Sequence, residues 1–129
     1  GGHFYFDGGV SNSIPLNFAE KHYDKNIVIT TQPKSYRKKR DKLWPIEKVV
    51  LHNYPAVLEK IKTRSADYNA CLNEIEDKEN KGDIFVIRPP HSLNIGTMEN
   101  DQSELRRVYQ IGRKEAEQKL TLLEKYLNC

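Results

Sequence analysis

Apolar residues along this 129-residue chain gather in short continuous runs separated by longer stretches with a helical period. The short runs lie at 3–6, 26–31 and 83–88, and they are rich in aromatic or β-branched residues. Runs of this kind without clean alternation are typical of strands that are covered on both faces. The pattern therefore predicts three strands, each ended by a glycine or proline soon after the run.

Helices are predicted between these strands from apolar positions that recur every three or four residues. The predicted helices are a short one from Leu16 to about Tyr23, a second at 46–52, a long one at 55–79 and a last one ending at Leu127. Asn12 or Ser13 is expected to cap the first, with Pro15 in its first turn. Pro55 is expected to begin the long helix and Gly82 to end it.

The last helix is expected to start at a cap formed by Asp101 or Ser103. Its predicted packing stripe consists of Leu105, Val108, Gly112, Ala116, Leu120, Leu123 and Leu127. Glycine within a helix costs roughly 1 kcal/mol relative to alanine. On an apolar stripe, Gly112 is therefore interpreted as a place where another element packs closely.

Alternating strands and helices predict an α/β fold with a small, mostly parallel sheet and right-handed crossovers. We expect a three-layer α/β/α arrangement, with about three strands covered by helices, over a single domain at 1–129. The sequence shows no internal repeat and no low-complexity segment.

Composition indicates a folded, rather polar protein, with 37% hydrophobic and 30% charged residues. No apolar run approaches the ~20 residues that a membrane span needs. The two cysteines, Cys71 and Cys129, form neither a disulfide framework nor a Cys-x-x-Cys pair. We therefore expect both thiols to be reduced and the protein to be cytoplasmic, with peripheral membrane contact left open.

The net charge is a mild +3, but the charge is concentrated in one segment at 34–42. Its basic residues are Lys34, Arg37, Lys38, Lys39, Arg40 and Lys42. The favoured interpretation is a solvated loop. A second interpretation is contact with anionic lipid headgroups, worth roughly 1 kcal/mol per basic residue near the surface. Nucleic acid is a third, but no recognised motif supports it and we expect no such partner.

The four histidines offer no pair at metal-ligand spacing, and the cysteines lie far from them. The sequence therefore predicts no metal site. No organic cofactor is expected either.

Asp7 is the main candidate for chemistry, because it ends the first predicted strand and is followed by Gly8 and Gly9. Functional groups gather at the carboxyl ends of parallel strands, and a carboxylate there can act as a general base. The glycines permit unusual backbone angles and leave room for a substrate or a partner loop. On spacing alone, a simple Asp-Gly turn explains the same residues.

The stretch from Tyr5 to Pro15, YFDGGVSNSIP, closely resembles the Asp-Gly-Gly block of patatin-like phospholipases. A bacterial branch of that family is similar at later stretches too. These are 26–39, Tyr54-Pro55, Arg64 with Tyr68-Asn69, Ile87-Arg88-Pro89, and Tyr109 with Gly112. The ordered series covers nearly the whole chain and is more specific than the first block alone.

The resemblance implies that Asp7 pairs with a serine on a Gly-x-Ser-x-Gly elbow to form a two-residue catalytic dyad. This chain has no such elbow and no glycine-rich oxyanion loop. We therefore expect it to be the C-terminal part of a serine acyl-ester hydrolase whose serine lies in a missing N-terminal part. Lipid or acyl-ester substrates are implied for the whole protein, while the fragment alone is expected to be inactive.

An alternative is a non-catalytic module that binds a partner or an anionic membrane through the segment at 34–42. A nucleic-acid-binding domain is the further alternative. A truncated parallel sheet exposes an edge strand and apolar faces, so we also expect the fragment to associate with itself.

Overall fold

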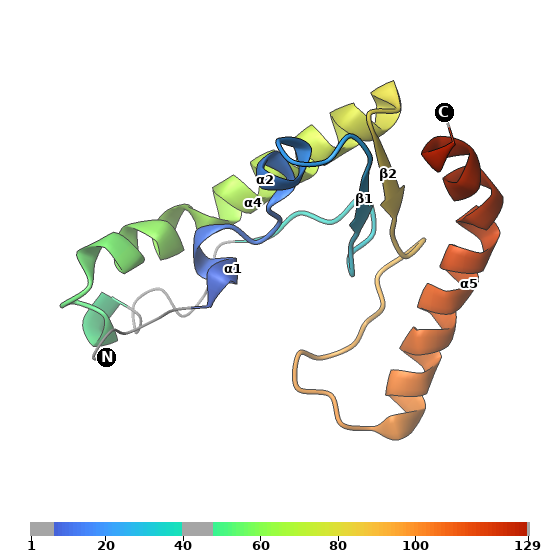
Figure 1. The fold of residues 1–129 in the computed structure, drawn as a ribbon. Helices are drawn as coiled ribbons and strands as arrows, with labels where there is room; N and C mark the ends of the chain where they lie inside the picture. Colours follow the sequence, from blue (N-terminus) through green and yellow to red (C-terminus); the bar gives the residue numbers. More distant parts are fainter. Residues whose placement is uncertain (1–6, 40–47, 129) are drawn as a thin grey trace, which may run out of the picture.

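The computed structural model describes residues 7–39 and 48–128, and its elements alternate between helices and strands (Figure 1). Along the chain they are α1 (Gly8–Ser11), α2 (Leu16–Glu20), β1 (Asn26–Ile29), α4 (Pro55–Lys81), β2 (Ile84–Ile87) and α5 (Gln102–Leu127). Residues 48–50 add a short helical segment before α4. The strand expected at 3–6 and the start of the helix expected at 46–52 lie outside the described residues.

The two strands pair in parallel, with Asn26 opposite Ile84 and Ile29 opposite Ile87. A parallel pair needs a crossover connection, and α4 provides it. The Thr30 N–H donates to the Ile87 carbonyl at 3.0 Å, which extends the pairing just beyond the strands. The predicted strands at 26–31 and 83–88 and their parallel direction are therefore confirmed, although each is only four residues long.

A small core lies on the face of the strand pair that α4 and α2 cover. Ile75 of α4 is its most deeply buried side chain, only 1% exposed. The other members are all aliphatic: Leu16, Val28, Ile84 and Val86. Full burial of one such side chain contributes about 1.5–3 kcal/mol. With so few members in the cluster, the packing of each one matters to stability.

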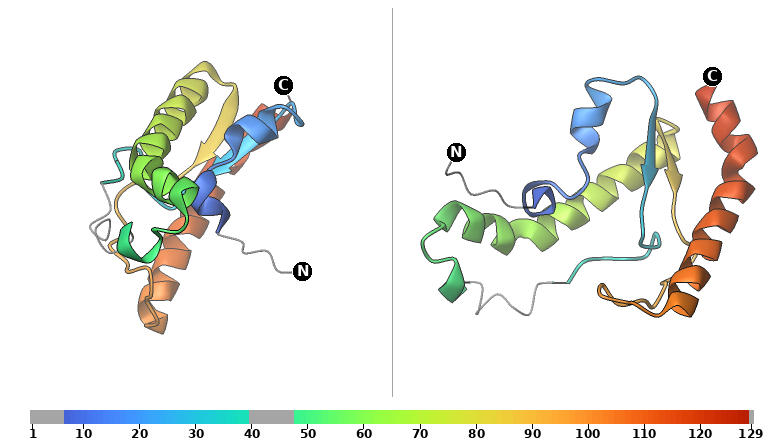
Figure 2. Two further views of the ribbon diagram at one scale, coloured as in Figure 1. Left: turned by 90° about the vertical axis from the view of Figure 1, so that its left-hand side faces the viewer. Right: turned by 60° about the horizontal axis from the view of Figure 1, so that its bottom comes forward.

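The opposite face of the strand pair is covered only in part, by α5 alongside β2 (Figure 2). The rings of Phe85 and Tyr126 pack there with centroids 5.7 Å apart. Side chains alternate between the faces of a strand, so Ile27 and Ile29 of β1 point to the same side. They remain 42% and 73% exposed.

The predicted boundaries of the long helix hold closely, because local signals define them. Pro55 occupies its first turn, and Gly82 follows its last residue with a φ of 81°. In that left-handed conformation the Gly82 N–H bonds back to the carbonyls of Lys78 and Glu79. A side chain at this position would strain the backbone, which is why glycine ends the helix.

The predicted packing stripe of α5 is buried only in part, although its predicted start and end are correct. Val108 and Leu123 of the stripe are half-buried. Leu105, Leu120 and Leu127 from the predicted stripe are about half exposed, at 47%, 52% and 47%. Gly112 has nothing within 4 Å of the place where a Cβ would stand, so no described element packs against it. The face of α5 toward β2 instead carries half-buried Lys119 and Tyr126. Long amphipathic side chains thus make part of this contact.

The expected cap of α2 is also wrong. Pro15 stands at the cap position with no side-chain hydrogen bond, and α2 ends at Glu20 rather than near Tyr23. Ser13 instead donates its hydroxyl to the Gly9 carbonyl at 2.8 Å. The serine was thus assigned to the wrong helix.

The described residues form a mixed helix and strand structure, with helices dominant and a small two-stranded parallel sheet. This confirms the α/β prediction at a coarse level. The third strand of the predicted sheet, at 3–6, lies outside the described residues, and residues 7–39 and 48–128 show no three-layer arrangement.

Candidate functional site

Asp7 stands directly before α1 and caps it. Its Oδ1 accepts a hydrogen bond from the Gly9 N–H at 2.9 Å, and the residue is exposed. Its Oδ2 has no hydrogen-bond partner among residues 7–39 and 48–128. The carboxylate is therefore fixed through one oxygen and accessible through the other. The predicted local turn and an available base are compatible in this geometry.

Gly8 and Gly9 form the first turn of α1 with ordinary negative φ angles. The unusual backbone angles that these glycines permit are not used here. These glycines instead leave space beside the Asp7 carboxylate. Nothing lies within 4 Å of a Cβ built at Gly8, and one built at Gly9 would lie 3.5 Å from Asp7 Oδ1. These two positions therefore place no side chain beside the carboxylate.

The serines closest to Asp7 in sequence donate their hydroxyl protons to backbone carbonyls rather than to the carboxylate. Ser11 Oγ donates to the Gly8 carbonyl at 3.0 Å, and Ser13 Oγ donates to the Gly9 carbonyl at 2.8 Å. No serine of the described part of the chain bonds to Asp7. An isolated hydroxyl in this environment is a weak nucleophile, because it needs an adjacent base.

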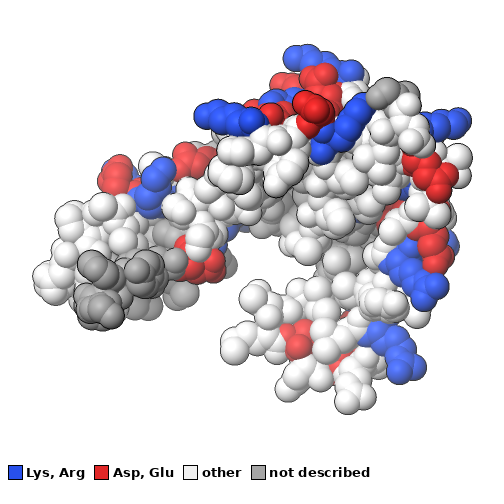
Figure 3. Space-filling model, in the orientation of Figure 1, with Lys and Arg blue, Asp and Glu red and all other residues white. Residues whose placement is uncertain are grey.

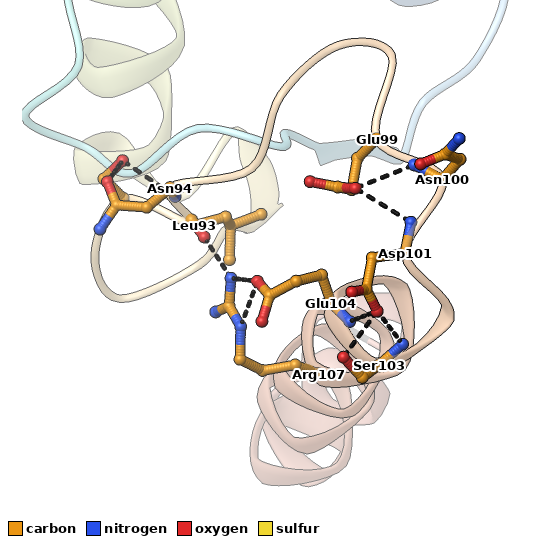
Figure 4. A network of polar contacts seen from close by, with 9 residues as sticks. Leu93, Asn94, Glu99, Asn100, Asp101, Ser103, Glu104 and Arg107 are labelled. Atoms are coloured by element: carbon orange, nitrogen blue, oxygen red, sulfur yellow. Dashed lines mark hydrogen bonds and ion pairs between the residues drawn. The ribbon is translucent and has the colours of Figure 1, made fainter.

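A different serine does bond to an aspartate, at the start of α5 (Figure 4). Ser103 Oγ donates to Asp101 Oδ1 at 2.6 Å, and the same oxygen accepts from the Ser103 and Glu104 N–H groups. The Ser103 hydroxyl and these backbone bonds hold the pKa of Asp101 below its usual range. A carboxylate stabilised in this way is a poor proton acceptor, so the pair is a helix cap.

The same network ties the loop after β2 to α5 (Figure 4). Arg107 donates to Glu104 Oε2 at 2.7 Å and to the Leu93 carbonyl at 2.7 Å. Glu99 Oε1 accepts from the N–H groups of Asn100 and Asp101, each at 2.9 Å. This loop is therefore held against the first turn of α5 by polar contacts.

The basic segment is a loop in its described part, residues 34–39, and most of it is exposed as expected, but it is also tied to α4. Lys34 and Arg37 pair with Glu76 of α4 at 3.2 Å and 3.5 Å. The hydrogen bond from Lys34 lowers the pKa of Glu76. Asn69 brackets the Lys38 backbone, accepting from its N–H at 2.7 Å and donating to its carbonyl at 3.0 Å.

Two further contacts complete the docking of this segment on α4. The Lys38 ammonium lies 5.4 Å from the centre of the Tyr68 ring, and Ser65 Oγ donates to the Lys39 carbonyl at 3.0 Å. Arg40, also proposed for lipid contact, lies outside the described residues. Basic and acidic side chains are intermingled on the face shown in Figure 3.

A groove that the sequence reasoning missed opens at the carboxyl ends of β1 and β2, beside α5. Its volume is about 540 Å³. The lining is mainly apolar and includes Ile29, Ile87, Pro89, Val108, Ile111 and Ala116. Ligands of parallel sheets gather at this edge. The signal was present in Gly112, which lines the groove but was interpreted as a packing contact.

No group of three or more His, Cys, Asp or Glu among the described residues could hold a metal ion. None of the helices in residues 7–39 and 48–128 combines the length and apolarity needed to cross a membrane. Cys71 is a free thiol that lies 3.7 Å from the Ile14 carbonyl, and burial raises its pKa.

Comparison with known proteins gives one family. Residues 54–128 match the family described as Domain of unknown function (DUF6363), and this match spans more than half of the 129 residues. The chain therefore belongs to that family. The matched part contains α4, β2 and α5, whereas Asp7 and the segment at 34–39 precede it. No curated protein and no solved structure matches the chain significantly.

Proposed function

We propose that this member of the DUF6363 family is the C-terminal part of a serine acyl-ester hydrolase in which Asp7 is the base. The exposed Asp7 carboxylate carries the proposal. One oxygen is fixed by the Gly9 N–H at 2.9 Å, and the other has no partner among the described residues. A second oxygen presented in this way can accept a proton from a hydroxyl supplied by another part of the protein.

The proposed chemistry needs a serine from outside this chain. Its Oγ attacks the ester carbonyl carbon while its proton passes to Asp7, and a tetrahedral oxyanion forms. Collapse of that intermediate expels the alcohol, which takes the proton, and leaves an acyl-enzyme. Water, deprotonated by Asp7, then releases the acid and regenerates the serine. Backbone N–H groups of an oxyanion loop, also outside this chain, would stabilise the charge.

The uncovered side of the strand pair supports a larger fold. Ile27 and Ile29 of β1 are exposed, and large apolar side chains on a strand normally pack against another layer. The Thr30 N–H points to β2, so by alternation the N–H groups of Ile27 and Ile29 point away from it. We infer that further strands and helices of the parent complete a three-layer α/β/α sheet at this edge.

Without those additional elements the edge is free to pair with another copy. Natural edge strands are usually protected by charge or proline, whereas β1 exposes isoleucines. We therefore expect this chain to self-associate at ~100 µM by light scattering, and Ile29→Lys to reduce the association. If the unmodified chain is strictly monomeric at that concentration, the proposal that its sheet is incomplete is contradicted.

The proposal is tested on the natural product rather than on this chain. An antibody against the described region should detect a protein much longer than 129 residues in its source cells. A serine-directed fluorophosphonate should label that product on a Gly-x-Ser-x-Gly serine. A natural product of this length alone, or one with no labelled serine, would reject the hydrolase assignment.

A narrower test uses the chain itself. Because its own serines lie elsewhere or bond to the backbone, it should not turn over p-nitrophenyl esters. Turnover that Asp7→Ala abolishes would show that Asp7 acts without an external serine.

A further inference from the structure

A small cavity lies between the turn that follows α1 and one face of α4, separate from the groove beside α5. The turn contributes Ser11, Asn12, Ser13 and Ile14. From α4 come Arg64, Asp67, Tyr68 and Cys71, whose spacing of three, four and seven residues places them on one helix face. We call this space, of about 50 Å³, the Arg64 cavity.

Arg64 is half-buried here and lacks the partner that such a residue normally has. Its Nε is fully buried and finds no hydrogen-bond acceptor among the described residues. No ion pair of this guanidinium with another described residue is present either. More than about nine in ten buried donors have a hydrogen-bond partner, and buried charges are normally paired. Arg64 lines the cavity, so it brings to this space a positive charge that has no ion-pair partner among the described residues.

The other polar groups of the cavity suit a tetrahedral anion better than a water molecule alone. The Tyr68 hydroxyl stays protonated at neutral pH, since burial raises its pKa, and it can donate. The Asn12 amide offers further N–H donors.

Asp67 limits the charge that the cavity can accept. It is exposed at the rim, and its Oδ2 accepts a hydrogen bond from Thr63 Oγ1 at 2.8 Å. Its negative charge lies near that of any bound anion and opposes a dianion more than a monoanion. A singly charged phosphate, such as a phosphodiester carries, fits this balance.

We propose that the Arg64 cavity binds a singly charged phosphate group, with the Arg64 guanidinium donating to two of its oxygens. A planar guanidinium matches this arrangement with two parallel hydrogen bonds. The phosphate can come from a phospholipid headgroup or from free phosphate. The inference does not depend on ester hydrolysis, because it concerns binding by this chain alone.

The experiment is a titration of the isotope-labelled chain followed by NMR at the Arg64 Nε–H resonance. The probes are dimethyl phosphate, inorganic phosphate and a short-chain phosphatidylglycerol below its micelle concentration, each up to about 20 mM, since weak sites of this type bind in the millimolar range. Arg64→Gln is the test variant. Arg106→Gln, which changes an exposed arginine of α5, is the matched control.

Saturable shifts at Arg64 are expected, with binding at least about tenfold weaker in Arg64→Gln and unchanged in Arg106→Gln. Tighter binding of the phospholipid identifies the headgroup as the source, and equal binding identifies free phosphate. Should Arg64→Gln fail to fold, Tyr68→Phe keeps the ring contacts and is expected to weaken binding several-fold. An Arg64 resonance that none of the probes moves, or binding that neither variant weakens, would overturn the proposal.

Discussion

Removal of the Tyr126 hydroxyl is the most informative single change in this fold. The hydroxyl lies between the starts of the two strands, 3.1 Å from the Asn26 N, 3.2 Å from the Asn26 O and 3.0 Å from the Asp83 O. It thus bridges β1 and β2 where their pairing begins. Tyr126→Phe deletes this bridge while the ring keeps its contact with Phe85.

The magnitude follows from what the hydroxyl can do. With one proton, it accepts from the Asn26 N–H and donates to only one of the two carbonyls at a time. Asn26 is 9% exposed, so its N–H would lose its partner at a buried residue. A buried donor left unsatisfied costs about 1–3 kcal/mol, and we expect about 2 kcal/mol here. For 129 residues this corresponds to a melting temperature about 7 °C lower.

The assay is thermal and urea unfolding followed by circular dichroism, with Tyr23→Phe as the control. Tyr23 is 66% exposed and its hydroxyl makes no hydrogen bond within the described residues. The control should unfold like the parent chain. If Tyr126→Phe loses no more than about 0.5 kcal/mol relative to this control, the bridge between the strands does not hold α5 to the sheet.

Three further changes test other local contacts. Asp101→Ala should lower the melting temperature at neutral pH. Because the folded pKa of Asp101 lies below its ordinary 3.8, the difference from the unmodified chain should vanish as the pH falls through that lowered value. A difference that calorimetry finds unchanged in acid would contradict the cap. Gly82→Ala should cost about 1–2 kcal/mol in urea unfolding, since its φ of 81° is strained for any side chain, and a neutral result would show that the backbone relaxes. Glu76→Gln should release Lys34 and speed tryptic cleavage after it, while Arg37 keeps its hydrogen bond to Asn73 Oδ1 at 3.1 Å. Unchanged cleavage would show that the other contacts with α4 hold this segment.

Local signals made part of this fold predictable. Pro55 and Gly82 constrain the backbone by themselves, so the ends of α4 could be predicted without tertiary information. The strands could be predicted too, because short β-branched runs between glycine and proline have few other stable arrangements.

Long-range contacts could not be predicted in the same way. The apolar stripe of α5 gives a helix but does not say which side meets the sheet, and the structure places half-buried Lys119 there, donating to the Val86 carbonyl at 2.9 Å. The ion pairs that hold 34–39 on α4 are similarly hidden, because Glu76 lies far along the chain. A run of charged residues can be recognised from neighbouring positions, but its distant ion-pair partners cannot be identified from the sequence.

The candidate sites also differ in how far local sequence could predict them. A carboxylate followed by two glycines could be recognised at Asp7, whereas the Arg64 cavity requires a turn and a helix that lie far apart in sequence to meet. Sequence spacing along α4 alone would suggest only an amphipathic face.

The measurement that tests the central claim most directly is ester hydrolysis by the complete natural product, comparing Asp7→Asn with Asp24→Asn. Asp24 is another exposed aspartate, and it makes no hydrogen bond within the described residues. We predict that Asp7→Asn lowers kcat by at least about a hundredfold, as loss of a general base does, while Asp24→Asn leaves it unchanged. Equal activity in the two variants would contradict the role of Asp7 as the base.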